Sequence, residues 1–212
     1  MTRVVAYVLA LLLAAGPAAA GPLSDLIFAP GAAAGTADVS YAHARQVPAG
    51  LPEDAALPKS VSDEVLTLAQ SSGAAPRRVL TRQGPGAAAS PVSEFPLSGP
   101  DPVLLYFLES TARNMAALTG GSPFYIRNRI REALGQADLG IEVAVEGQPA
   151  RQIVLRPFEA DPNRASMGAF AELALTLVVE TAEPPRFLSL SADTAVAEGG
   201  YHESLTLMPE EE

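Results

Sequence analysis

The segment 101-DPVLLYFLESTARNMAALTGGSPFYIRNRIREALG-135 decides the fold, because it predicts two consecutive helices between stretches with the pattern of strands. Asp101-Pro102 and Ser122-Pro123 each place an N-cap residue before a proline at the first helical position, where the missing N–H breaks no hydrogen bond. Gly120-Gly121 ends the first helix near Leu118, and the second helix runs to about Gly135. So short a turn predicts a helical hairpin or corner.

Apolar side chains recur on one face of each predicted helix. The second helix carries an i, i+4, i+7, i+8 series, namely Ile126, Ile130, Ala133 and Leu134. The stripe of the first helix consists of Leu104, Leu105, Phe107, Leu108, Ala112, Met115 and Leu118. Such a stripe packs against a sheet as core, or it lines a cavity between sheet and helices that holds an apolar ligand.

The sequence on both sides of the helices has the two-residue period of strands. After residue 140, strands are predicted at 141–145, 153–155, 173–179, 186–191 and 201–208. Before the helices we expect a strand at 38–47 and a hairpin of 64–70 with 77–82, followed by a long connection at 84–100. Strands with short connections pair antiparallel. This order predicts an α+β fold, a single domain in which a curved antiparallel sheet packs the two-helix hairpin on one face.

The first twenty residues have the three regions of a secretion signal. A short basic start precedes the apolar run Val4–Ala15, and Ala18-Ala19-Ala20 before Gly21 is a signal-peptidase pattern. The run is 12 residues long. As a helix it spans about 18 Å, whereas a bilayer core is roughly 30 Å thick. We therefore expect a signal peptide at 1–20, a flexible segment at 21–37, the domain at 38–208 and an acidic tail at 209–212. The expected location is the periplasm, with secretion as the alternative.

Composition excludes several classes of protein. The chain has no cysteine, which rules out disulfides, thiolate catalysis, zinc–thiolate sites and lipid attachment at the cleavage site. Without the signal, 13 basic side chains stand against 24 acidic ones, a formal charge of −11 that argues against a nucleic-acid partner. No later stretch approaches the roughly 20 apolar residues of a membrane span, so no stable membrane insertion is expected after cleavage.

Four arginines on the helices, Arg113, Arg127, Arg129 and Arg131, suggest a DNA-binding helix pair. Secretion and the acidic net charge oppose that interpretation. Arg127 and Arg131 are four residues apart, so they line a solvated helix face or pair with carboxylates at the sheet edge. The functional alternative is a site for a carboxylate, a phosphate or a lipid head group.

The remaining polar residues give little support to a metal site. His43 and His202 each lie on a predicted strand beside a tyrosine, and Glu203 points to the opposite side of its strand from His202. Two histidines without a third ligand make a poor zinc site, so both are expected at the surface and no metal is expected. Glu159 and Asp161 beside Asn163 lack the spacing of a calcium loop and indicate a turn.

Catalytic motifs are missing from the chain. It contains no Gly-x-Ser-x-Gly elbow, no Ser-x-x-Lys and no Gly-Lys-Ser/Thr phosphate loop. The carboxylates Glu53, Asp54, Asp63 and Glu64 are expected in a solvated acidic loop. We therefore expect no catalytic residue and no cofactor.

The order of elements over 100–208 resembles the outer-membrane lipoprotein carrier architecture, and the run 119–134 resembles uncharacterised secreted bacterial proteins. The resemblance implies a fold and an envelope setting but carries over no functional residue. The expected function is a non-catalytic periplasmic protein that binds an apolar ligand or an envelope protein. The candidate ligand-binding residues are Leu104, Phe107, Leu108, Met115, Arg127 and Arg131.

Two alternatives remain: an envelope hydrolase with an unrecognised serine or carboxylate site, and a structural subunit that assembles through a strand edge. An apolar cavity under the first helix would favour ligand binding. A polar cleft collecting Asp161, Arg164 and His202 would favour catalysis, and a filled interior with a bare strand edge would favour assembly.

Overall fold

The computed structural model describes residues 38–53, 56–72, 74–182, 185–194 and 200–209. The predicted signal peptide and the segment 21–37 lie outside the described residues, as does all but the first residue of the acidic tail. Among the described residues, no helix combines the length and apolarity that crossing a bilayer requires.

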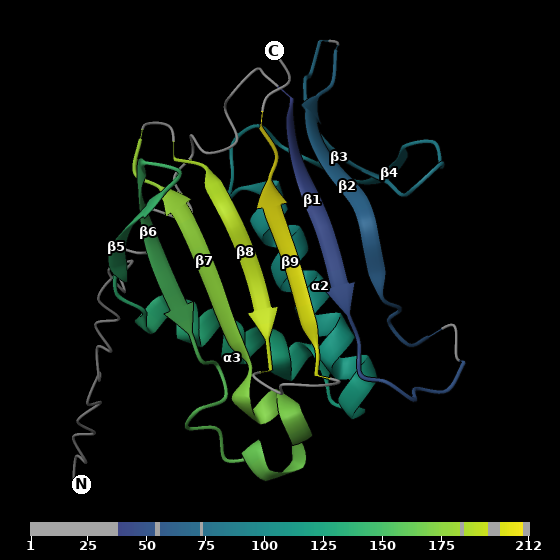
Figure 1. Ribbon diagram of the computed structural model, residues 1–212, viewed down its shortest axis with the longest axis vertical. Coiled ribbons are helices and arrows are strands. Elements are labelled where there is room, and N and C mark those ends of the chain that lie inside the picture. The colour runs from purple at the N-terminus through teal and green to yellow at the C-terminus, as the bar shows by residue number, and fades with distance from the viewer. Residues whose placement is uncertain (1–37, 54–55, 73, 183–184, 195–199, 210–212) are drawn as a thin grey trace, which may run out of the picture.

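One antiparallel sheet of nine strands forms the frame of the molecule (Figure 1). Its spatial order is β4-β3-β2-β1-β9-β8-β7-β6-β5, so the first and last strands of the chain are neighbours in the centre. The strands are β1 (Val39–Gln46), β2 (Val61–Gln70), β3 (Arg78–Gln83), β4 (Ser90–Phe95), β5 (Ile141–Val145), β6 (Gln148–Leu155), β7 (Ala174–Glu180), β8 (Phe187–Asp193) and β9 (His202–Leu207).

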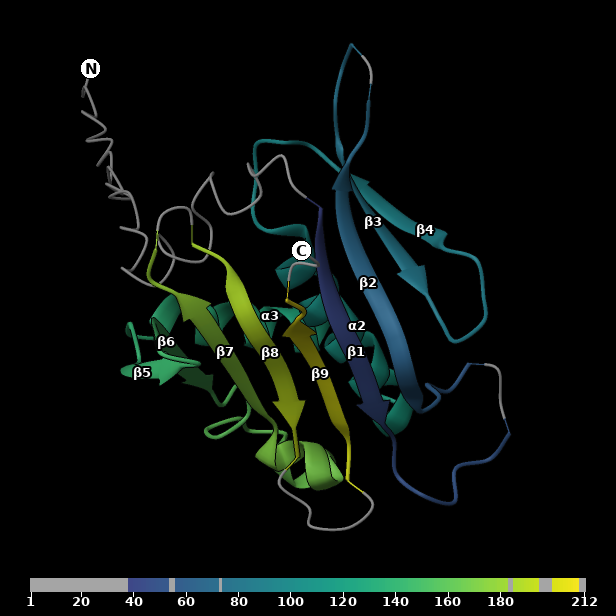
Figure 2. The same ribbon diagram turned by 45° about the horizontal axis from the view of Figure 1, so that its top comes forward.

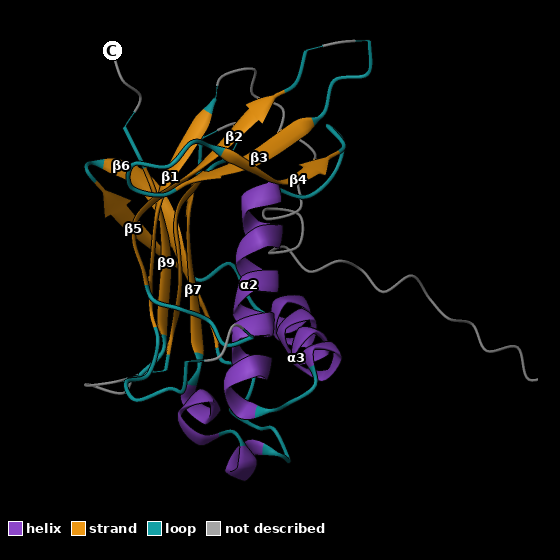
Figure 3. Ribbon diagram, turned by 90° about the vertical axis from the view of Figure 1, so that its right-hand side faces the viewer, coloured by secondary structure: helices purple, strands orange, loops and turns teal. Residues whose placement is uncertain are grey.

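Two helices, α2 (Pro102–Thr119) and α3 (Pro123–Gln136), cover one face of this sheet. Figure 3 shows that the sheet curves around them, so that β2, β3 and β4 reach over one end of α2. Figure 2 shows β4 at one edge of the sheet and β5 at the other. Two short 3-10 helices, Arg164–Ser166 and Gly168–Glu172, connect β6 to β7. The predicted α+β architecture, with a curved antiparallel sheet and helices on one face, is confirmed.

Local capping explains where the helices begin and end. The Asp101 carboxylate accepts hydrogen bonds from the backbone N–H groups of Val103 (2.7 Å) and Leu104 (3.4 Å). Gly120 follows α2 with a φ of 70°, the left-handed conformation that glycine adopts without strain. The Ser122 hydroxyl accepts from the Tyr125 N–H at 3.4 Å and starts α3. The predicted helix boundaries agree with the structure to within one or two residues.

The core lies between the sheet and α2. Alternate residues of each central strand point inward, as in β7, where Leu175, Leu177 and Val179 are buried. α2 contributes Leu104 and Phe107 from its sheet-facing side. The inward-facing side chains of the strands and the apolar face of α2 therefore form one apolar layer.

Two parts of the N-terminal half differ from expectation. β4 lies inside 84–100, which was expected to be a connection; its SPVSEF sequence is almost entirely exposed, so no apolar period marks it. A bulge between Leu80 and Thr81 accommodates its pairing with β3. Asp63 and Glu64 belong to β2 rather than to an acidic loop. Glu53 does lie in the loop before β2, and Asp54 is outside the described residues.

Candidate functional site

A buried histidine joins the central strands. His43 of β1 is 1% exposed, so the expectation of a surface histidine was wrong. Its Nδ1 lies 2.6 Å from Glu64 Oε1 on β2, and its Nε2 lies 3.0 Å from Glu203 Oε1 on β9. Ala42 and Ala44 lie on the exposed side of β1, and His43 between them points to the opposite side, toward the helices. Each ring nitrogen faces a carboxylate oxygen, so the ring is held from both sides.

Glu203 is the centre of this polar network. Besides His43, the Ser110 hydroxyl on α2 donates to its Oε1 at 2.7 Å, and the Tyr201 hydroxyl donates to its Oε2 at 2.5 Å. Arg45 Nε adds a positive charge 3.7 Å away. Burial works to raise the pKa of Glu203, but the His43 hydrogen bond, the Arg45 charge and the two hydroxyl donors outweigh it and hold that pKa below its ordinary value.

Aromatic residues and an amide close the network. Burial, followed by the nearby Glu203 carboxylate, raises the pKa of Tyr201, so its phenol keeps its proton and remains a donor. The Asn114 amide donates to the Tyr201 hydroxyl at 2.9 Å. The Tyr106 ring meets the His43 ring edge-on, with 6.0 Å between centroids. The network therefore joins α2 to β1, β2 and β9, although the buried Arg45 Nε has no hydrogen-bond partner within it.

The contacts of the network hold structural elements together, and they do not pair a nucleophile with a base. The Ser110 hydroxyl faces Glu203 and not His43, so this cluster does not form a serine–histidine pair. His202 lies on the other side of β9, where its Nδ1 is 3.0 Å from Asp193 Oδ2. Glu203 and His202 thus point to opposite sides, as predicted. Among the described residues, no three His, Cys, Asp or Glu side chains are grouped so as to hold a metal ion.

A groove of about 560 Å³ opens over this network, between β4 and α2. We call it the β4–α2 groove. Its lining combines apolar, hydroxyl, amide and charged side chains: Arg45, Arg82, Val92, Ser93, Phe95, Leu105, Tyr106, Glu109, Ser110, Arg113 and Asn114. Three of these residues are basic and one is acidic, whereas the whole chain has 14 basic and 24 acidic side chains. The lining therefore gathers three arginines in an acidic protein, and each has a carboxylate beside it, from Glu203, Glu64 and Glu109 respectively.

The three arginines of the groove differ in exposure. The side chains of Arg82 and Arg113 are 49% and 70% exposed, whereas that of Arg45 is only 12% exposed. Arg82 Nε lies 3.7 Å from Glu64 Oε2, and Arg113 Nε lies 2.5 Å from Glu109 Oε1. Arg82 and Arg113 are thus the two cations that a ligand reaches from solvent.

A second groove of about 250 Å³ lies between α2 and α3. We call it the α2–α3 groove. It is lined by Leu105, Leu108, Glu109, Arg127, Ile130, Arg131 and Leu134. Leu105 and Glu109 also line the β4–α2 groove, so the two grooves lie on either side of the same ridge of α2.

The six predicted ligand-binding residues separate into two groups. Leu108, Arg127 and Arg131 line the α2–α3 groove. The other three, Leu104, Phe107 and Met115, are buried in the core between α2 and the sheet.

Arg127 binds a helix carboxylate rather than one at the sheet edge. Its Nε lies 2.6 Å from Glu109 Oε2, and its Nη2 lies 2.7 Å from Oε1 of the same group. These bonds, more than partial burial, set the pKa of Glu109 below its ordinary value, and Arg113 lowers it further. Arg131 Nη1 donates to Asn128 at 2.9 Å, also on α3.

The residues expected to mark a polar cleft for catalysis serve as anchors. The single hydroxyl of Tyr125 donates to the Asp161 carboxylate and is shared between its two oxygens, 2.9 Å from Oδ1 and 2.8 Å from Oδ2. The same carboxylate has Oδ2 2.8 Å from Arg129 Nε. It thereby fixes α3 to the loop after β6. Arg164 pairs with Glu172 across the two 3-10 helices.

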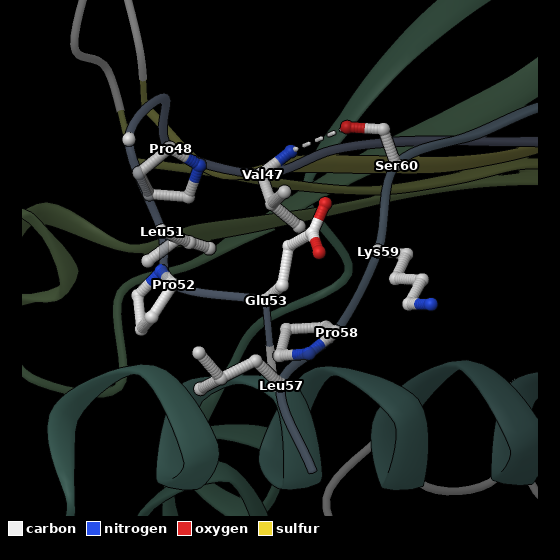
Figure 4. Close-up of a pocket in the computed structure, with 10 residues that line it drawn as sticks. Val47, Pro48, Leu51, Pro52, Glu53, Leu57, Pro58, Lys59 and Ser60 are labelled. Carbon is white, nitrogen blue, oxygen red and sulfur yellow. Dashed lines mark hydrogen bonds between the residues drawn. The ribbon is translucent and has the colours of Figure 1, made fainter. Parts of the chain in front are cut away.

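A further hollow lies within the loop between β1 and β2. Figure 4 shows Val47, Pro48, Leu51, Pro52 and Pro58 around it. The contact drawn is the bond from the Val47 N–H to the Ser60 hydroxyl, at 3.4 Å. Residues 54–55 of this loop lie outside the described residues.

Sequence reasoning missed Arg45, Arg82, Ser110 and Asn114. A signal existed, since His43 and Arg45 are two residues apart on β1 and so share its inner face. Comparison of the sequence with known protein families and with curated proteins returns no match.

Proposed function

We propose that this protein is exported to the periplasm, or secreted, and binds an anionic ligand in the β4–α2 groove without catalysing a reaction. The observation that carries this proposal is the gathering of three arginines in the lining of that groove, in a chain of formal charge −10. Arg82 and Arg113 are exposed there, and guanidinium groups bind carboxylates and phosphates through paired hydrogen bonds.

The lining supports an amphipathic ligand over a simple ion. Val92, Phe95 and Leu105 supply apolar surface beside the arginines. Ser93 and Asn114 add groups that fix orientation. Pockets for small molecules commonly combine apolar walls with a few polar groups, and a volume of about 560 Å³ falls within their range.

A binding role also agrees with the network beneath the groove. Ser110 and His43 both contact Glu203 instead of each other, so the hydroxyl has no base beside it in this cluster. Export rests on the pattern of residues 1–20.

Native mass spectrometry of the protein purified from its own cells tests both parts. A mass corresponding to a chain that starts at Gly21 supports export, and the full-length mass contradicts it. Solvent extraction then identifies any bound molecule. We expect an anionic amphiphile, and binding of added dodecyl phosphate or dodecanoate, measured by calorimetry below the micelle concentration.

The matched variants are Arg82→Gln and Arg113→Gln in the groove and Arg151→Gln outside it. Arg151 pairs with Glu142 at the far edge of the sheet, 2.9 Å apart. Each groove variant should weaken binding about tenfold, or about 1.4 kcal/mol, because a charge-assisted hydrogen bond is lost. Arg151→Gln should bind like the wild type. If neither amphiphile binds, or all three variants bind alike, the groove is not the site.

A second candidate, assembly through a strand edge, is favoured by β5. This strand is one edge of the sheet, and its Ile141 is 64% exposed. Val154 of the neighbouring β6 is also exposed. Light scattering over a range of concentrations separates the two candidates: a monomer that binds amphiphiles fits the first, and a ligand-free oligomer that Ile141→Lys dissociates fits the second.

A further inference from the structure

We infer that the ligand is a single-chain amphiphile whose anionic head lies in the β4–α2 groove and whose alkyl chain crosses α2 into the α2–α3 groove. This inference rests on the proposed function, and it adds the chemical class of the ligand and its path over the surface.

The continuity of the two grooves carries the first step. Leu105 and Glu109 line both, so the grooves meet along one turn of α2. Glu109 is held by Arg113 from one side and by Arg127 from the other. Glu109 and its two arginines therefore occupy one end of the part of α2 that both grooves share. Leu105 is the apolar residue of that part, and the alkyl chain would cross α2 there.

The α2–α3 groove has the character of a site for an alkyl chain. Its lining is mostly apolar, from Leu105, Leu108, Ile130 and Leu134, with the charged Glu109, Arg127 and Arg131 beside them. Arginine stems are aliphatic up to the guanidinium, so they extend the apolar wall while their charges face solvent.

Arginines line both ends of the path, and the second groove differs from the first in its larger share of aliphatic side chains. The head end has the exposed Arg82 and Arg113 with the more buried Arg45 behind them. A second copy of this acidic chain would bring net negative charge but no alkyl chain for the second groove. A ligand with one anionic end and one apolar chain satisfies both grooves, and the head is a carboxylate or a phosphate.

Calorimetry with two homologous series tests the inference on the protein purified from its own cells. One series runs from ethyl phosphate to dodecyl phosphate and the other from propionate to dodecanoate, with inorganic phosphate as the chainless probe. Affinity should rise roughly fourfold for each methylene that is buried. The series with the tighter members identifies the head group, and tight inorganic phosphate binding without any rise indicates a free anion.

Leu108→Asn should flatten the dependence on chain length while leaving ethyl phosphate binding unchanged. The control is Leu118→Asn, a half-buried leucine on the same helix that lines neither groove. A dodecyl phosphate with a terminal diazirine, photolysed on the wild type, gives a readout that does not depend on a variant folding. Crosslinks should fall at Leu108 and within 127–134.

The outcomes separate this inference from the proposed function. Binding that is independent of chain length, or crosslinks confined to β4, overturns the inference and leaves the anion site standing. If none of the probes binds, both fail. A length-dependent affinity that Leu108→Asn abolishes, with crosslinks on both helices, supports both.

Discussion

Asp101→Asn gives the sharpest test of the buried electrostatics, because one carboxylate there caps α2 from inside the core. Asp101 accepts hydrogen bonds from the N–H groups of Val103 and Leu104. Burial raises its pKa from 3.8 to about 6, although these two hydrogen bonds and the charge of Arg78 pull it down. In Asp101→Asn the amide oxygen still accepts these two hydrogen bonds, but the side chain carries no charge that burial would penalise.

The sign follows from proton linkage. Between pH 3.8 and about 6 the folded protein holds a proton on Asp101 that the unfolded chain has lost, so this group makes stability fall as pH rises through that window. The full difference between 3.8 and about 6 corresponds to about 3 kcal/mol. About 2 kcal/mol of this is expressed between pH 4 and pH 7. Asp101→Asn should therefore gain about 2 kcal/mol relative to the wild type over that range.

Urea unfolding of both proteins at pH 4, 5, 6 and 7 measures this difference, and subtraction removes the titration of the groups the two share. Asp138→Asn is the control, because Asp138 is exposed yet its carboxylate also accepts a backbone N–H, that of Gly140 at 2.8 Å. A constant difference between Asp101→Asn and wild type across these pH values would refute the reasoning. A difference of the opposite sign would mean that Arg78 outweighs burial.

Three further substitutions test the packing, each by urea unfolding. His43→Leu should lower the unfolding free energy by roughly 3 kcal/mol, because the buried Glu203 loses one of its donors and Glu64 loses the same partner; an unchanged midpoint contradicts the network. Ile130→Asp should lower it by more than about 3 kcal/mol, since a charge enters a buried site, and retention of the wild-type melting temperature would show that α3 does not pack there. Glu146→Asn should raise it by up to about 1 kcal/mol, because Glu146 (φ 50°) and Gly147 (φ 83°) form a two-residue hairpin turn in which asparagine is less strained; a loss of stability speaks against that turn.

The fold was predictable where its determinants are local. Asp101-Pro102 and Ser122-Pro123 act within three residues of themselves, so the sequence shows where both helices begin. The alternation in β7 likewise identifies a strand with one buried face. β4 was not predicted, because an exposed edge strand that contains Pro91 has neither a capping motif nor an alternation of buried and exposed residues. Only its pairing with β3 makes it a strand.

The site was less predictable because it depends on register between distant strands. Arg45 of β1 stands opposite Glu203 of β9, and that pairing joins residues from the two ends of the domain. His43 and Glu203 lie in one network because β1 and β9, from opposite ends of the domain, are neighbours in the sheet. His202 faces the other side of β9, as the alternation along the strand predicts.

The network under the groove decides which arginines meet the ligand. Arg45 is one of the groups that stabilise the buried Glu203 charge, so drawing it outward would leave that carboxylate with one partner fewer. A buried charge that loses a partner is strongly destabilising. The constraint is weakest for Arg113, because its partner Glu109 is 35% exposed, whereas Arg82 faces Glu64, whose side chain is 13% exposed. We therefore expect an anion in the proposed site to draw on Arg113 first and on Arg82 second, while Arg45 acts on it through its electric field from the floor.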